Sequence, residues 1–95
     1  MYIKYIWDKK KNEANIRNHG IDFADVPKIF EHPTIQNIDT RFDYGEERWI
    51  AIGFLTSHIM AVVVYVEKTE DTIRIISARK ANKFEEKYYK SRIKN

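Results

Sequence analysis

The sequence predicts a single α+β domain, in which a mostly antiparallel sheet of about four strands packs with two N-terminal helices and one C-terminal helix. Three observations support this prediction. The second half of the chain holds several strand-forming segments at short intervals, and both ends hold helix-forming segments. The 95 residues, 43% hydrophobic and 14% aromatic, are enough for one core and too few for a second domain. Residues 1–95 are therefore expected to form one domain.

The first helix is bounded by residues that favour helix ends. Asp8 is a typical N-cap and Gly20 a typical C-cap, and residues 9–19 between them contain neither Pro nor Gly. The preceding residues 2–6 are mostly aromatic or β-branched, which favours a short strand. The chain is therefore expected to open with a strand followed by a helix.

A second helix is expected to begin at Asp22, which is a suitable N-cap, and to end before Pro33. Pro27 falls near its first turn, where a missing backbone N–H is tolerated. Residues 34–38 have some strand character, and residues 39–47 are typical of a charged loop. The main strands are expected to follow this loop.

Three strands and a last helix are expected in the remainder of the chain. Residues 48–56 alternate in polarity, as in a strand with one buried face. Residues 59–67 are almost all apolar, as in a central strand covered on both faces. Residues 72–77 form the last strand, and a helix follows from residue 80 or 82 to residue 93.

On this last helix, lysines recur every three or four residues and would form one basic stripe. Its members are Lys80, Lys83, Lys87, Lys90 and Lys94. A neighbouring sector with Ala81, Phe84 and Tyr88 would dock the helix on the sheet. The stripe is a candidate surface for an anionic partner, although solvent-exposed lysine faces are the commoner explanation.

Positive charge is concentrated at the two ends of the chain. Residues 1–20 carry five cations and two acids, residues 74–95 carry eight cations and two acids, and residues 21–73 carry four cations and ten acids. The net charge of +3 therefore hides an uneven distribution. A fold that brings the ends together has a basic face suited to phosphate backbones or an acidic protein. An ordinary mixed surface is the alternative.

The junction over residues 73–81 is the strongest candidate for an anion site. An apolar strand leads into the expected helix start, where Arg79 and Lys80 are adjacent. A helix start presents unpaired backbone N–H groups and a partial positive charge, which favour a bound phosphate. Two cations are unfavourable there unless an anion or an acidic partner lies beside them. A frayed helix start with solvated cations is the alternative.

The first helix carries Lys11, Asn15 and His19 at intervals of four, so these side chains stack on one side. Imidazole groups titrate near neutral pH, which makes His19 a candidate acid or base, although a histidine at a helix end more often stabilises the helix dipole. No His pair or acidic cluster has metal-ligand spacing, and without Cys no thiolate site exists. We expect neither a metal nor a cofactor.

Several of these residues resemble a known family. The similarity rests on Trp7-Asp8, Lys11, Asn15, His19-Gly20, Phe23, the segment 44–49, Gly53 and residues 73–81. They are similar to the BrnT toxins of bacterial type II toxin–antitoxin modules, over nearly the whole chain. The resemblance implies a ribonuclease related in fold to the RelE toxins. It also implies neutralisation by a BrnA-like, DNA-binding antitoxin that represses the operon.

Two positions depart from the family pattern. Asn18 stands where the family often has Lys before the His-Gly pair, which removes one cation from the expected RNA face. Pro27 is expected to shorten the second helix. Neither touches Arg48, Arg79 or Lys80, so both concern affinity more than activity.

RNA cleavage without a metal needs a base for the 2′-hydroxyl, cations for the phosphate and an acid for the leaving oxygen. We assign Arg48, Arg79 and Lys80 to the scissile phosphate. The planar guanidinium group of Arg in particular has N–H donors that match the spacing of phosphate oxygens. The acid or base is a histidine, with Lys11 or Glu47 as substitutes. The expected catalytic residues are His19, Arg48, Arg79 and Lys80.

Other basic and polar side chains are expected to bind the RNA strand. They are Lys11, Asn15, Arg74, Lys83 and Lys87. Strand alternation puts Arg74 on the side opposite Ile73 and Ile75, where it either pairs with an acid such as Glu46 or Glu47 or faces substrate.

Three aromatic residues are candidates for stacking on unpaired bases, as single-stranded RNA recognition requires. They are Trp7, Tyr44 and Trp49. Large aromatic side chains are usually part of the core, and we expect this for Trp49.

A second hypothesis is a non-catalytic basic module that binds RNA, or only an acidic protein, through the same cations. Direct DNA recognition is weaker still, because no helix-turn-helix or ribbon pattern occurs and the resemblance assigns operator DNA to the antitoxin. The chain has no long apolar run and no leader-like N-terminus, so we expect a soluble, cytoplasmic protein without membrane contact.

Overall fold

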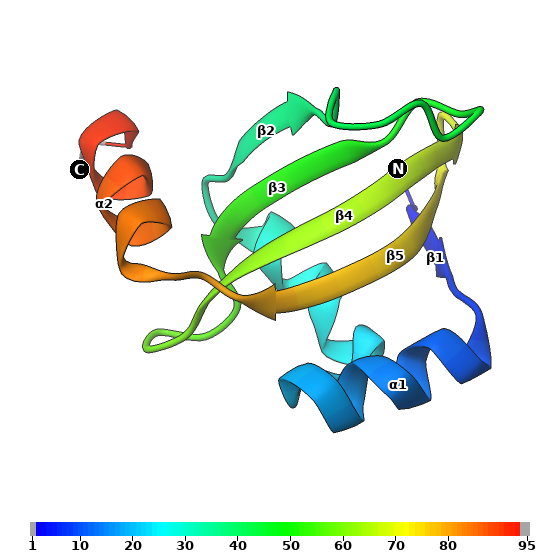
Figure 1. Cartoon of the computed structure of the whole chain (residues 1–95), viewed down its shortest axis with the longest axis horizontal. Helices are drawn as coiled ribbons and strands as arrows, with labels where there is room; N and C mark the ends of the chain where they lie inside the picture. The colour runs from blue at the N-terminus through cyan, green and yellow to red at the C-terminus, as the bar shows by residue number, and fades with distance from the viewer. Residues whose placement is uncertain (1, 94–95) are drawn as a thin grey trace.

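Five strands form one sheet in the spatial order β1-β5-β4-β3-β2 (Figure 1). The computed structural model describes residues 2–93. In chain order the elements are β1 (Lys4–Ile6), α1 (Lys9–His19), the 3₁₀ helix η1 (Phe23–Glu31), β2 (Ile35–Ile38), β3 (Trp49–Phe54), β4 (Met60–Thr69), β5 (Thr72–Lys80) and α2 (Lys83–Arg92). Strand β1 runs parallel to β5, and the other neighbours are antiparallel. Within residues 2–93, no helix has the length and apolar character needed to span a bilayer.

The α+β class and the mostly antiparallel sheet are confirmed, whereas the expected number of strands is too low. Strand β2 accounts for the difference. It is only four residues long and mostly exposed, so it lacks the strong apolar alternation that marks a strand in a sequence.

Helix α1 has the predicted ends. The Asp8 side chain accepts a hydrogen bond from the Lys11 backbone N–H at 3.0 Å. Gly20 is left-handed, with φ 72°, and its N–H donates to the Ile16 carbonyl. These caps satisfy backbone groups that a helix of little apolar surface would otherwise expose. The helix lies beside β5 (Figure 1), along the part of that strand beyond its short pairing with β1.

One face of the sheet is covered by η1, which supplies the largest buried side chains. Phe23, Val26 and Ile29 have no exposed surface and pack on the central strands. Burial of side chains of this size contributes about 1.5–3 kcal/mol each. The segment winds as a 3₁₀ helix, since Pro27 lacks a backbone N–H and disfavours the α conformation of the residue before it.

The opposite face of the sheet is covered by α2 at one end only. Tyr89 is 5% exposed, packs on this face and donates its hydroxyl to the Pro33 carbonyl at 2.7 Å. The prediction that Phe84 and Tyr88 dock this helix is confirmed for Tyr88 and wrong for Phe84, which is 79% exposed. The inward side of α2 follows Glu85 and Tyr89, four residues apart, and Phe84 falls beside it.

Of the two predicted starts of the last helix, the one at Asn82 is confirmed, and the one at Arg79 and Lys80 is wrong. Both residues belong to β5, because the ten-residue strand β4 provides pairing partners for them. Helix α2 begins after Asn82, whose side chain accepts from the Glu85 N–H, while Glu85 accepts from the Asn82 N–H in a capping box. The argument from helix-dipole strain therefore does not apply to these two cations.

Candidate functional site

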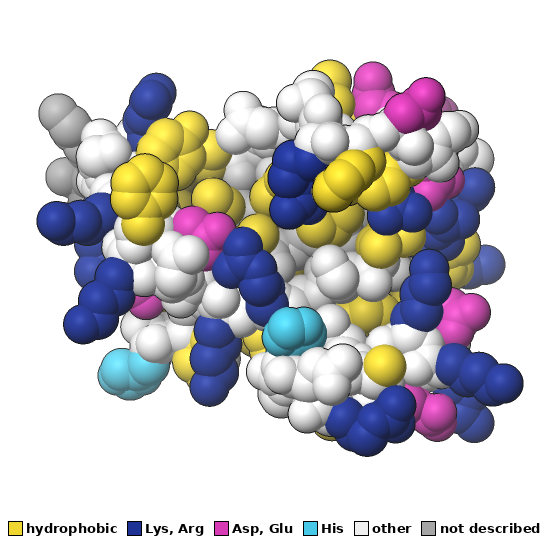
Figure 2. Space-filling view, in the orientation of Figure 1, with side chains coloured by type: hydrophobic (Ala, Val, Ile, Leu, Met, Phe, Trp, Pro, Cys, Tyr) yellow, Lys and Arg dark blue, Asp and Glu magenta, His cyan; other side chains and the backbone are white. Residues whose placement is uncertain are grey.

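The part of the sheet that α2 leaves uncovered forms a groove of about 430 Å³. Its floor is apolar and comes from β3 and β4, whereas its rim is polar and partly charged. The floor residues are Ile50, Ile52, Val62 and Val64, and the rim residues are His19, Asn37, Arg41, Ser77, Ala78, Arg79 and Glu85. We call this the arginine groove. Figure 2 shows blue side chains and a cyan one around the middle of this face.

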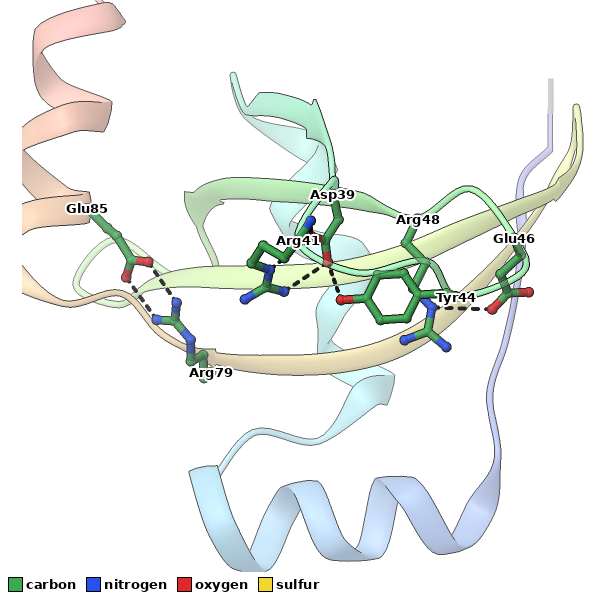
Figure 3. A network of polar contacts seen from close by, with 7 residues as sticks. All are labelled: Asp39, Arg41, Tyr44, Glu46, Arg48, Arg79 and Glu85. Atoms are coloured by element: carbon green, nitrogen blue, oxygen red, sulfur yellow. Dashed lines mark hydrogen bonds and ion pairs between the residues drawn. The ribbon is translucent and has the colours of Figure 1, made fainter.

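Arg79 is held at the groove by Glu85, which also belongs to the capping box of α2. Its Nη1 and Nη2 donate to the two carboxylate oxygens of Glu85 at 2.8 and 2.7 Å (Figure 3). These hydrogen bonds hold the pKa of Glu85 below its ordinary value and raise the pKa of Arg79. The Nε–H of Arg79 takes no part in this pair, so the guanidinium keeps a donor for a further anion.

Arg41, which the sequence analysis missed, is fixed by a buried carboxylate. Its Nε and Nη2 each donate to Asp39 at 2.9 Å, and Tyr44 donates its hydroxyl to the same carboxylate at 3.0 Å (Figure 3). The Asp39 side chain has no exposed surface, whereas that of Arg41 is 60% exposed. A signal was present in the sequence, since Asp two residues before Arg is typical of a turn in which the carboxylate accepts the later backbone N–H.

Two guanidinium groups therefore meet at one groove. They lie close enough that the charge of Arg41 opposes the rise in the pKa of Arg79, which is due mainly to Glu85. His19, at the end of α1, lines the same groove. Adjacent positive charges that are each held by a carboxylate suit a multiply hydrogen-bonded anion such as a phosphodiester.

Of the four predicted catalytic residues, the groove brings together His19 and Arg79. Arg48 lies further along the same face, where it donates to Glu46 at 3.3 Å (Figure 3). Ile52 of β3 lies level with Arg79 across the sheet, and Arg48 comes four residues before Ile52. Four residues span about 13 Å along a strand. Arg48 and Arg79 are therefore too far apart to bind the same phosphate group. They could instead bind different phosphates of one nucleic acid strand.

Arg74 lies beside Arg48, and both pair with one carboxylate. Its Nη2 donates to Glu46 at 2.7 Å, which confirms the first of the two alternatives for this arginine, pairing with an acid of the 46–47 pair. Arg48 also covers the Tyr44 ring, with its Cζ 4.1 Å from the ring centroid. We call the sheet face opposite η1, which α2 covers at one end only, the open face. It carries cations along its length, from Arg79 to Arg74.

The expectation that Lys80 acts beside Arg79 is corrected. Lys80 pairs with Ala61, which belongs to the core under η1, whereas Arg79 pairs with Val62 on the open face. Successive strand residues point to opposite faces, so the two adjacent cations are separated by the sheet.

Asn15 is also misassigned, because it is 6% exposed and its amide is used inside the fold. The side chain donates to the Ile21 carbonyl at 2.9 Å and accepts from the Ala78 N–H at 3.1 Å. It joins α1 to the edge of β5, and both of its polar atoms are engaged inside the fold. The prediction that Asn15 and His19 lie on the same side of α1 is confirmed, since both side chains lie on the side that meets β5.

The remaining predicted RNA-binding residues lie outside the groove. Lys11 is exposed near the start of α1, and Lys83 and Lys87 line a separate depression of about 520 Å³ on α2 beside Phe84. Lys94, the last member of the predicted stripe, lies outside the described residues. The groove also takes one cation, Arg41, from the acidic middle of the chain, which the charge distribution did not indicate.

Two of the three candidate stacking residues belong to the packed interior. Trp7 and Trp49 pack on the core under η1, and Trp7 meets Phe23 edge to face at 6.3 Å. The prediction of a core position is confirmed for Trp49. Tyr44 alone reaches the open face, beside Arg48.

No group of three or more His, Asp and Glu side chains within residues 2–93 is arranged to hold a metal ion. The charged groups of the groove are instead paired with one another. The groove and its paired carboxylates offer hydrogen-bond donors, a histidine and two carboxylate groups.

The sequence matches the profile of a family described as the ribonuclease toxin BrnT of a type II toxin–antitoxin system, over residues 7–85. The chain belongs to the BrnT family. A crystal structure of the Brucella abortus ribonuclease toxin BrnT is similar, with 30% sequence identity, a TM-score of 0.66, and coverage of 85% of this chain and 99% of that one. A search of curated protein sequences gave no match. The BrnT match includes all the charged residues of the arginine groove, from His19 to Glu85.

Asp39→Asn is expected to destabilise the fold at neutral pH and to matter less in acid. Hydrogen bonds from Arg41 are the main reason that the pKa of Asp39 lies well below its usual range. A carboxyl whose pKa is lowered by folding stabilises the folded state above its unfolded pKa of about 4, and this contribution is lost as the pH falls further. Urea unfolding should give a difference of about 1–2 kcal/mol from wild type at pH 7 and less near pH 3.

Glu47→Gln in the same loop is the matched control, because Glu47 is exposed. It should unfold like wild type at both pH values. A difference between Asp39→Asn and wild type that stays constant with pH would contradict the role of the ionised Asp39 carboxylate.

Proposed function

We propose that this BrnT-family chain is a metal-independent endoribonuclease that cleaves single-stranded RNA in the arginine groove and thereby inhibits translation and growth. The observation that carries the proposal is the meeting of His19, Arg41 and Arg79 at one groove. The family's description as ribonuclease toxins supports the reaction class.

Each group at the groove has a role in this reaction. The 2′-oxygen forms a bond to phosphorus while the bond to the 5′-oxygen breaks, and His19 takes the 2′-hydroxyl proton or protonates the leaving oxygen. Arg41 and Arg79 donate hydrogen bonds to the phosphate oxygens, on which charge grows in the transition state. Glu85 is a poor base, because its hydrogen bonds to Arg79 lower its pKa. The substitutes named from the sequence, Lys11 and Glu47, do not line the groove.

The first test is cleavage of single-stranded RNA by the purified chain in excess chelator. Wild type should cleave, whereas Arg41→Ala and Arg79→Ala should each cleave about 10²–10³-fold more slowly, as for loss of a donor to a developing anion. Arg79→Lys is the control for a folding defect, because it keeps a positive charge beside Glu85 and loses only the planar guanidinium group. Lys80→Ala is the matched control, since it removes a charge on the other face and should retain full activity.

The non-catalytic module makes a different prediction in this assay. It binds RNA in the groove and yields no cleavage, with or without chelator. Cleavage that appears only when ribosomes are added supports an enzyme that requires the ribosome. Cleavage that stops with chelator would overturn the metal-independent mechanism.

The proposed partner is a BrnA-like, DNA-binding antitoxin, since type II systems pair a toxin with a protein antitoxin. We propose that it covers the cations of the open face, that operator DNA is bound only through it, and that both proteins act in the cytoplasm. In the same assay, added antitoxin should stop cleavage. An interface that leaves Arg41, Arg48 and Arg79 accessible would contradict this placement.

A further inference from the structure

An aromatic pair, of which one ring is exposed, lies on the loop between β2 and β3, beside the arginine groove. Phe42 is 70% exposed, although most of the residues around it in this loop are charged or polar. Its ring meets that of Tyr44 edge to face, with the centroids 5.8 Å apart. We call Phe42 and Tyr44 the aromatic step.

The aromatic step is held in place by the charged residues around it. The Tyr44 hydroxyl donates to the buried Asp39 carboxylate, and Arg48 covers one side of the Tyr44 ring. Asp39 also accepts the Arg41 backbone N–H at 3.1 Å, which fixes the residue directly before Phe42. The Phe42 ring is thus presented to solvent from a loop segment whose neighbours are hydrogen-bonded.

Tyr44 lies between two groups of cations on the open face (Figure 3), and the Phe42 ring packs against it. Figure 3 shows Tyr44 between Arg41 on the groove side and Arg48 at the other end. Arg74 joins Arg48 through Glu46. Aromatic rings beside two sets of guanidinium groups match the alternation of base and phosphate along a nucleic acid strand.

We infer that Phe42 is the stacking surface for an unpaired nucleobase next to the phosphate held in the arginine groove. The inference rests on the proposed function for the identity of that phosphate. A base inside a duplex has both faces covered, so the step selects single-stranded RNA. Tyr44 supports Phe42 from the side and orients it.

The test uses two single-stranded probes that lack the 2′-hydroxyl needed for cleavage. One is a deoxyoligonucleotide, and the other is an abasic deoxyribose-phosphate oligomer of equal length and charge. Fluorescence anisotropy should give wild type a higher affinity for the base-containing probe. Phe42→Ala should weaken binding of this probe about 5- to 100-fold, as for loss of one stacked base, and leave the abasic probe unchanged.

Phe42→Trp should restore the preference for bases, since it keeps an aromatic face at this position. In the cleavage assay, Phe42→Ala should raise KM more than it lowers kcat, because stacking is retained through the reaction. Equal weakening for both probes, or none for either, would overturn the inference. So would unchanged probe binding combined with weaker antitoxin binding, which would assign the ring to the protein partner.

The outcomes keep the inference apart from the proposed function. A preference for bases that depends on Phe42 in a protein that never cleaves RNA supports the stacking site and rejects the nuclease. Cleavage by wild type that Phe42→Ala leaves unchanged in KM rejects the stacking site and leaves the nuclease intact.

Discussion

His19→Ala is expected to slow RNA cleavage by about 10²–10⁴-fold, the usual contribution of a general acid or base. His19 is the histidine of the arginine groove, and the carboxylates there are engaged with Arg41 and Arg79. The side chain is exposed at the last residue of α1, so its loss should cost at most about 1 kcal/mol of stability. The measurement is single-turnover cleavage in excess chelator, with RNA affinity determined in parallel on a 2′-deoxy probe.

Two variants sharpen this prediction. His58→Ala removes an exposed histidine from the β3–β4 turn and should cleave RNA like wild type. His19→Gln keeps a hydrogen-bonding group but cannot transfer the proton, and should be nearly as slow as His19→Ala. Full activity in His19→Gln would leave His19 a binding role only and remove proton transfer by this residue from the mechanism.

The sequence predicted those parts of the fold that depend on neighbouring residues. The caps Asp8 and Gly20 and the apolar runs of β3 and β4 are local signals, and the structure follows them. The end of β5 is not a local property. Arg79 and Lys80 suit a strand or a helix equally, and the ten-residue strand β4 beside them decides in favour of the strand.

The site was predictable only where one residue type and one element sufficed. His19 at a helix end was placed in this way, whereas Arg79 was selected for a helix start that the structure does not have, although it does line the groove. Arg41 was not, because its place beside Arg79 depends on the path of the loop around the buried Asp39. Spacing also could not tell a ligand-binding amide from a structural one, as Asn15 demonstrates.

Asn15→Ala is expected to lower the free energy of unfolding by about 2–5 kcal/mol, since each buried polar group left unpaired costs about 1–3 kcal/mol. The two groups are the Ile21 carbonyl and the Ala78 N–H. Strand β1 pairs with β5 only at residues 72–74, so within the described sheet no strand supplies a partner for Ala78 on that side. For a domain of this size, thermal unfolding should shift down by roughly 10–30 °C.

Asn18→Ala is the matched control, because this asparagine lies one turn later on α1 and is exposed. It should change stability by less than about 0.5 kcal/mol. Asn15→Asp keeps an acceptor for the Ala78 N–H but buries a charge and loses the donor to Ile21, so it should also unfold early. A stable Asn15→Ala protein that has lost RNA affinity would instead return Asn15 to the RNA-binding surface. An unstable Asn15→Ala protein would establish that Asn15 holds α1, and with it His19, against the edge of β5.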